Sequence, residues 1–206
     1  MLRPTWPPAC CHGRGASLPR SSRWRRSAWS PAANAHLLAG LRQEQVDFVI
    51  GRLVDPSGMQ GLSFEPLYSE CLIFVVRDGH PLARQGRVSP ASLDQWRLVL
   101  PDAGTRIRES ADRFFLGSGI GLPERVVETI DASFGRSYVR QTDAVWFVPE
   151  GAVEADLREG RLLRLPVDTR STEGAVGLTV RAGYLPSAAV QRLLEDIRRC
   201  VPAARA

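Results

Sequence analysis

Residues 67–82 read LYSECLIFVVRDGHPL. The centre of this stretch, residues 71–76, is one of the longest uninterrupted apolar runs of the chain, and it has the length of a buried strand. Asp78-Gly79 and His80-Pro81 follow it, and both pairs are typical of turns. The stretch therefore predicts a buried strand that ends in a turn. Since no apolar run approaches the roughly 20 residues that cross a bilayer, we expect no membrane-spanning segment.

Strands and helices alternate on either side of this strand. Short apolar runs predict further strands at 46–51, 62–68, 97–100, 126–127, 144–148, 162–165 and 176–180. Apolar residues at helical spacing predict helices that begin near residues 34, 104, 131, 150 and 187, and in the third of these Phe134 and Tyr138 are expected to face inward. The alternation predicts an α/β fold with a largely parallel sheet, which binds ligands at the carboxyl ends of its strands.

The basic character of the chain belongs to its first 33 residues. The formal net charge is +5, and all 27 basic residues are arginines. Six of them lie in 1–33, where there is no acidic residue, which leaves 21 against 22 acidic residues in 34–206. Residues 1–33 fit three alternatives: the product of a mis-set start or frameshift, a disordered tail, or a targeting segment. Each alternative predicts a disordered segment.

The motifs that carry enzymatic chemistry are absent from the sequence. There is no nucleophile elbow, zinc-protease motif, phosphate-binding loop or dinucleotide fingerprint. The four cysteines fit no zinc-binding spacing. His80 precedes a proline in a turn and is expected to be structural, while His36 is expected to be exposed in the first turn of a helix. We therefore expect no catalytic residue, no metal site and no cofactor.

Polar and cationic residues gather instead at the predicted helix starts. Each helix start presents backbone N–H groups with partial positive charge, and an arginine adds bidentate recognition of a carboxylate. Taken singly, these residues fit ordinary helix caps and surface charges. Taken together they predict a carboxylate-binding cleft, and they comprise Asn34, Thr105, Arg106, Arg108, Asp131 and Ser133.

Four stretches in this order resemble the LysR-type transcriptional regulators. They are residues 34–53, NAHLLAGLRQEQVDFVIGRL; residues 67–82; residues 143–151, DAVWFVPEG; and residues 176–181, VGLTVR. The resemblance implies two Rossmann-like lobes of periplasmic-binding-protein type 2 architecture, joined by two crossover strands, with the effector between them. It places residues 34–70 and 180–206 in the first lobe and 71–179 in the second.

The resemblance also implies the effector and its contacts. Residues 51–68, 102–115 and 128–138 look most like regulators of the protocatechuate branch of the β-ketoadipate pathway. This implies a small carboxylate such as β-ketoadipate or carboxymuconate. The residues that match effector-contacting positions of the family are Asn34, Arg52, Gly104, Thr105, Arg106, Ser133 and Phe134.

Two departures from the family pattern affect the partners and the stability that we expect. No helix-turn-helix precedes the resemblance, so we expect contact with DNA only through a full-length partner, in a homo-oligomer or hetero-oligomer of LysR-type chains. The first strand and helix of the first lobe are also missing, so we expect that lobe to be truncated and less stable than the second. We expect a cytoplasmic regulatory domain; the alternatives are a solute-binding protein of the same fold, an enzyme on that fold, and a non-functional truncated product.

Overall fold

The computed structural model describes residues 34–201, with side chains from His36 onward, and the expectations for residues 1–33 lie outside this range. The described chain forms two compact units. The first takes the described residues up to Ser69 and from Ala175, and the second is Glu70–Gly174. The chain thus passes between the units twice, at the end of β2 (Leu62–Glu70) and at the start of β8 (Gly174–Arg181). The expected lobe boundary after residue 179 remains a prediction; residues 175–179 group with the first unit, where β8 pairs with β1 (Val49–Arg52).

The second unit is built on a five-stranded sheet of order β5-β4-β6-β3-β7. Its strands are β3 (Leu72–Arg77), β4 (Leu98–Leu100), β5 (Val126–Glu128), β6 (Val145–Pro149) and β7 (Leu162–Arg164). β4 runs parallel to both β5 and β6, whereas β3 runs antiparallel to β6 and β7. β5, β4, β6 and β7 therefore run in one direction, as expected of a largely parallel sheet, and β3, the strand that enters from the first unit, is the exception.

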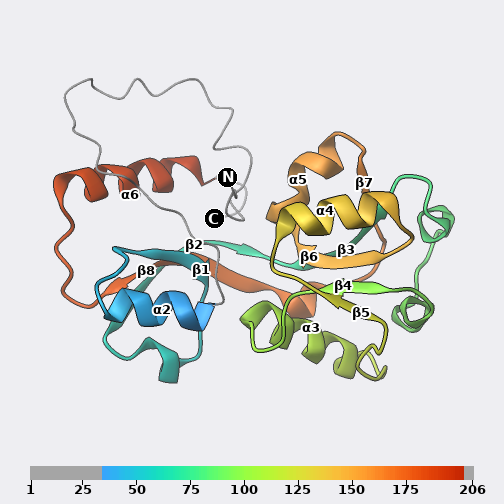
Figure 1. Ribbon diagram of the computed structural model, residues 1–206, viewed down its shortest axis with the longest axis horizontal. Helices are drawn as coiled ribbons and strands as arrows, with labels where there is room; N and C mark the ends of the chain where they lie inside the picture. The colour runs from blue at the N-terminus through green and yellow to red at the C-terminus, as the bar shows by residue number, and fades with distance from the viewer. Residues whose placement is uncertain (1–33, 202–206) are drawn as a thin grey trace. The chain divides into compact units, whose positions relative to one another are not determined.

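Helices cover both faces of this sheet (Figure 1). Residues 72, 74 and 76 of β3 point to α3 (Arg106–Gly117), and residues 73 and 75 point to α4 (Ala132–Gln141) and α5 (Glu150–Arg158). Since every residue of β3 from 72 to 76 is buried, the strand appears in the sequence as a continuous apolar run. Phe74 stacks on Phe147 of β6 with ring centroids 4.0 Å apart, and Phe114 and Phe115 of α3 pack around this pair.

Between β3 and β4 the chain forms two short 3-10 turns, η2 (Pro81–Arg84) and η3 (Pro90–Gln95). His80 begins the first of these turns: its Nδ1 accepts the N–H of Leu82 at 3.0 Å, and its Nε2 lies 3.2 Å from the carbonyl oxygen of Asp143. The imidazole is fully buried, 4.5 Å from the ring centroid of Trp96. The expected structural role of His80 is confirmed by these contacts. A third turn, η4 (Arg170–Thr172), precedes β8.

Of the two residues expected to face inward from α4, Tyr138 is partly buried against the core, whereas the expectation for Phe134 was wrong. Phe134 of α4 is 46% exposed and stacks on Tyr138, whereas Gly135 and Val139 are the buried residues of this helix. The reason is the close packing of α4 on β6. A β-carbon at Gly135 would lie 2.6 Å from Cζ2 of Trp146, so glycine occupies the contact with the sheet and the neighbouring Phe134 lies on the exposed side of the helix.

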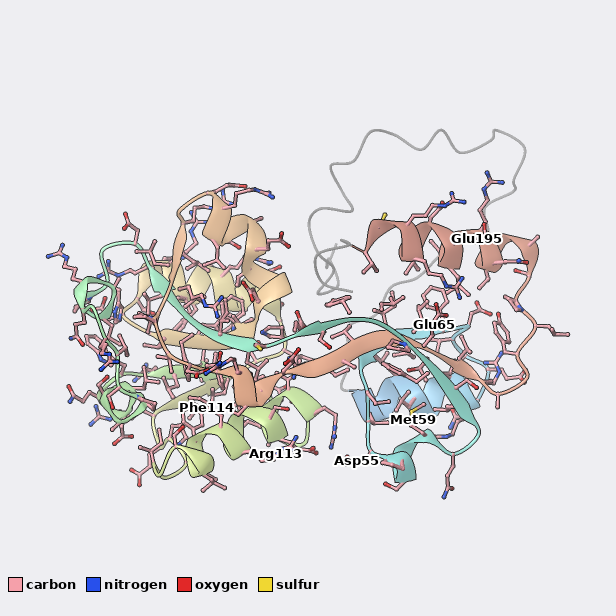
Figure 2. All side chains as sticks on the ribbon, turned by 180° about the vertical axis from the view of Figure 1, so that it is seen from behind. Asp55, Met59, Glu65, Arg113, Phe114 and Glu195 are labelled. Carbon is pink, nitrogen blue, oxygen red and sulfur yellow. The ribbon has the colours of Figure 1, made fainter. Side chains whose placement is uncertain are left out.

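The first unit contains a three-stranded sheet of order β1-β8-β2. α2 (Asn34–Arg42) packs Leu38 and Leu41 against Val49 on one face, and α6 (Ala188–Cys200) packs Leu194 and Ile197 on the other (Figure 1). Arg198 of α6 donates two hydrogen bonds of 2.7 Å to the carboxylate of Glu65 on β2, and Figure 2 labels this glutamate. The chain turns within this unit at η1 (Pro56–Met59).

The two units repeat one arrangement. In the first unit, α2 leads into β1, which runs antiparallel to β8, and β2 lies on the other side of β8. In the second unit, α4 leads into β6, which runs antiparallel to β3, and β7 lies on the other side of β3. Within residues 34–201, the first unit has no counterparts of β4 and β5. No helix in this range is long and apolar enough to cross a membrane.

Candidate functional site

Three helices begin at one edge of the five-stranded sheet. β5, β4 and β6 are parallel neighbours, so their carboxyl ends lie at the same edge, and Leu100 at the end of β4 is level with Glu128 at the end of β5. α3 follows β4, α4 follows β5, and α5 follows β6. The sequence-predicted residues of the second unit lie at the first two of these helix starts. A helix start favours anions because its first N–H groups carry partial positive charge.

The start of α3 is capped by a neutral side chain. Thr105 is buried, and its hydroxyl accepts the N–H of Arg108 at 3.2 Å and donates to the carbonyl oxygen of Asp102 at 2.8 Å. Gly104 precedes it with φ of +79°, a left-handed conformation that suits glycine. The sequence prediction placed the start of this helix correctly, because threonine is a preferred cap.

Arg106 is the first residue of α3, and it belongs to an ion pair within the helix. Its Nη1 lies 2.5 Å from a carboxylate oxygen of Glu109, and the arginine side chain is 23% exposed. A ligand carboxylate that approached this guanidinium would compete with Glu109. Because the pair is partly open to solvent, the competition is not costly.

Arg108 joins three elements at this edge. Its Nε donates to Asp112 of α3 at 2.8 Å, and its Nη1 donates to the carbonyl oxygen of Pro101 at 3.2 Å and to the carboxylate of Glu128. Burial acts against the charged guanidinium, but the bonds to Glu128 and Asp112 outweigh it, so the pKa of Arg108 is raised. The residue therefore ties α3 to the ends of both β4 and β5.

The start of α4 carries an anionic cap. A carboxylate oxygen of Asp131 accepts the N–H groups of Ser133 at 2.7 Å and Phe134 at 3.2 Å, while the Asp131 N–H donates to the hydroxyl of Thr129 at 3.0 Å. Ser133 is exposed, and the ring of Phe134 stacks on that of Tyr138. The Asp131 carboxylate already offsets the positive end of this helix, so a ligand here meets a hydroxyl and an aromatic ring.

The start of α5 is also next to a carboxylate. Glu70 accepts the N–H of Gly151 at 3.3 Å, and Glu150, the first residue of α5, pairs with Arg164 at 3.2 Å. Of the three helix starts, the α3 start is therefore the one whose cap is a neutral hydroxyl and which carries an arginine at its first position. Electrostatics favours a ligand anion there over the other two.

The remaining predicted residues, Asn34 and Arg52, belong to the first unit. α2 begins at Asn34, whose side chain lies outside the described ones. Arg52 is the last residue of β1, opposite Val176 of β8, and it is partly buried. The structure thus brings Gly104, Thr105 and Arg106 to the same sheet edge as Ser133 and Phe134. That all seven residues form one site stays a prediction.

Sequence reasoning missed the partners that hold this edge together. Asp112 follows Arg108 by four residues, a spacing that the sequence itself could have shown as a pair. Glu128 lies 20 residues beyond Arg108, and only the pairing of β4 with β5 brings it close. In the part of the chain that the structure describes, no group of histidine, cysteine, aspartate or glutamate residues is arranged to hold a metal ion.

Two α/β units joined by two chain passages, with helix starts at the carboxyl ends of parallel strands in the second unit, are the architecture of periplasmic-binding-protein type 2 domains. The chain belongs to the LysR family: the model of the LysR substrate binding domain matches residues 29–200. This is a family of transcriptional regulators and not of enzymes, in agreement with the expectation that the chain carries no catalytic site.

The chain is also similar to particular members of the family. It is 43% identical over 166 residues to the HTH-type transcriptional regulator PcaQ of Agrobacterium fabrum, a match that covers 80% of this chain and 53% of PcaQ. It therefore spans about half the length of that relative. The regulatory domain of Synechocystis CcmR, solved in complex with 2-PG, has a TM-score of 0.70 at 15% identity, covering 84% of this chain and 82% of that one.

The effector-binding domain of QuiR, solved in complex with shikimate, superposes with a TM-score of 0.67 at 17% identity, covering 82% of this chain and 78% of that one. At such low identities these two likenesses establish the fold. The expected family membership and fold are thus confirmed by the family match and by these structures.

Proposed function

We propose that this chain is the effector-sensing part of a LysR-family regulator and that its effector is a small carboxylate of aromatic catabolism, such as β-ketoadipate or carboxymuconate. Membership of the LysR family and the similarity to PcaQ support this proposal. The observation that carries it is the start of α3, where the neutral Thr105 cap and Arg106 favour an anion. A carboxylate there gains from the helix dipole and from the guanidinium.

The proposed contacts in the second unit lie at two helix starts, those of α3 and α4. Gly104, Thr105 and Arg106 would bind the carboxylate of the effector, and Ser133 and Phe134 its other side. The Thr105 hydroxyl donates its one proton to the carbonyl oxygen of Asp102, so it would exchange that bond for one to the effector. Of the two proposed acids, the unsaturated carboxymuconate suits this division better, because an aromatic ring at 46% exposure offers apolar area and the serine hydroxyl offers a hydrogen bond. The family resemblance implies that Asn34 and Arg52 of the first unit are further effector contacts. A second arginine would serve a dicarboxylate or tricarboxylate.

The output of the domain is control of transcription. A regulator acts where the DNA is, so the proposal places the chain in the bacterial cytoplasm. Self-association, or association with a full-length LysR-type chain, would pass the binding of the effector to DNA through that partner. These statements about partners rest on the family and on the resemblance to regulators of the protocatechuate branch.

A thermal-shift titration of the full chain tests the proposal. β-Ketoadipate and 3-carboxymuconate are added separately, with succinate as the control acid, because a ligand that binds the native state raises the melting temperature as its concentration exceeds the Kd. We expect a rise with one of the pathway acids and none with succinate. Thr105→Ala and Arg106→Ala should each reduce the rise, and Arg113→Ala on the exposed face of α3 should not. No rise with either pathway acid contradicts the proposal.

A further inference from the structure

The ion pair between Arg108 and Glu128 joins two segments that carry proposed effector contacts. One is the start of α3, with residues 104–106, and the other is the connection from β5 to α4, with residues 133 and 134. The arginine side chain is 13% exposed and the glutamate side chain 45%. Glu128 ends β5, and Arg108 lies in the first turn of α3, so the pair crosses from one strand–helix connection to the next. The carbonyl oxygen of Pro101, directly after β4, accepts from the same guanidinium at 3.2 Å.

Each end of this ion pair leads directly to a helix cap. On one side, the N–H of Arg108 is the group that the Thr105 hydroxyl accepts, so the residue that holds Glu128 also holds the α3 cap. On the other side, Thr129 follows Glu128; its N–H donates to the carbonyl oxygen of Leu100 at 2.9 Å, and its hydroxyl accepts the N–H of Asp131, the α4 cap. A shift of either partner would move one helix start relative to the other.

Asp112 fixes the orientation of the Arg108 guanidinium. It accepts from Nε of Arg108 while Nη1 reaches Pro101 and Glu128, so the planar guanidinium is fixed on two sides. A lysine at this position would keep the charge but would lose the fork that makes these contacts simultaneously. Such a replacement therefore removes the geometry of the contacts and keeps the charge.

We propose that Arg108 is a positioning residue of the effector site: its contacts with Glu128 and Pro101 set the spacing between Thr105 at the start of α3 and Asp131 at the start of α4. This inference rests on the proposed function, because the spacing matters for a ligand that contacts both helix starts. Arg108 itself acts through its neighbours and makes no contact with the effector.

Calorimetric titration of the full chain with 3-carboxymuconate and with β-ketoadipate, paired with thermal unfolding, separates positioning from stability. The variants are Arg108→Lys, which keeps the charge, Glu128→Gln, which keeps the acceptor oxygen, and the double variant. The matched control is Arg113→Lys on the same helix; Arg113 is labelled in Figure 2, is exposed, and donates to the carbonyl oxygen of Glu109.

We expect each single variant to raise the Kd about tenfold, because binding must then restore the helix spacing that about one charge-assisted hydrogen bond maintains in the unchanged chain. The double variant should be no weaker than the weaker single one, because both remove the same interaction. Arg113→Lys should bind as the unchanged chain does. If Arg108→Lys does not fold, Glu128→Gln, at a half-exposed position, carries the test.

Two results overturn the inference, and they differ from each other. If the unchanged chain binds neither acid, the proposed function fails and the positioning role fails with it. The unchanged chain could instead bind while Arg108→Lys and Glu128→Gln lower the melting temperature without changing the Kd. The ion pair would then only stabilise the fold, and the proposed function would stand.

Discussion

Gly135 of α4 lies directly against the indole of Trp146 on β6, so closely that a β-carbon on the glycine would come within 2.6 Å of the ring. The contact brings α4 onto the sheet and turns Phe134 outward. We expect Gly135→Ala to lower the free energy of unfolding by about 1 to 3 kcal/mol, the usual cost of overpacking a core. Chemical denaturation followed by tryptophan fluorescence measures the change.

Gly117→Ala is the matched control for this substitution. Gly117 ends α3, and no atom lies within 4 Å of a β-carbon built there. Alanine at this position should leave stability unchanged or raise it slightly, since it lowers the entropy of the unfolded chain. Equal effects of the two substitutions would show that the loss of glycine itself, and not the contact with Trp146, determines the outcome.

The buried His80 makes the stability of the second unit dependent on pH. Its Nδ1 accepts the N–H of Leu82, so the ring is neutral and carries its proton on Nε2, toward the carbonyl oxygen of Asp143. Burial lowers the pKa of His80, against the opposing effect of that hydrogen bond. Because the folded pKa lies below the unfolded value, the stabilisation is complete above about pH 6.5 and is lost as the pH falls through the folded pKa.

Urea unfolding at pH 5 and pH 8 tests this dependence. His80→Asn replaces the ring with an amide whose oxygen can still cap the N–H of Leu82 but does not titrate. We expect the variant to be less stable at pH 8, because it loses the contact with Trp96, and to show a smaller difference between the two pH values. His36→Asn, at an exposed position, is the control. An unchanged pH difference in His80→Asn excludes His80 as the cause.

The sequence predicted the elements well wherever a local pattern was decisive. The apolar run of β3 and the helical spacing of Ala111 and Phe115 in α3 reflect burial on a sheet, which the chain records residue by residue. The caps Thr105 and Asp131 were found because capping is a local interaction. These same caps predicted where two segments of the candidate site begin.

Features that depend on distant partners were not predictable in the same way. The direction of β3, antiparallel to its neighbours, depends on its place in the sheet, and no pattern within β3 shows this direction. The outward position of Phe134 depends on Trp146, and the ion pair of Arg108 with Glu128 depends on the pairing of β4 with β5. The helix starts were therefore predictable from the sequence, while the interactions between them were not.

Asp156 provides a test of buried charge in the second unit. Its carboxylate, 4% exposed, lies between Arg136 of α4 at 2.8 Å and Arg161 at 3.2 Å. Asp156→Asn removes the charge that both arginines contact, and we expect it to cost about 1 to 3 kcal/mol in the free energy of unfolding. Asp168→Asn makes the same replacement in an exposed pair with Arg170, and we expect no measurable change there. Similar losses in the two variants would contradict this account.

The pairing of Glu109 with Arg106 gives the most direct test of the α3 start. If Arg106 binds the carboxylate of the effector, Glu109 competes for the same guanidinium, 2.5 Å away. Glu109→Gln removes that competing charge and keeps the length of the side chain. We therefore expect the Kd for the pathway acid to fall about two- to fivefold, the range that an exposed ion pair of this kind allows. Calorimetric titration measures the change.

The control for this prediction must make the same change in charge away from α3. Glu195→Gln does so on α6 of the first unit, where Figure 2 labels the residue and its side chain is exposed. A general effect of net charge would tighten binding equally in both variants, and an effect through Arg106 would appear in Glu109→Gln alone. Titration at two ionic strengths adds a second check, because the gain should shrink as salt screens the competing carboxylate. An unchanged or weaker affinity in Glu109→Gln would remove Arg106 from the effector site and leave recognition to the positive end of the α3 helix.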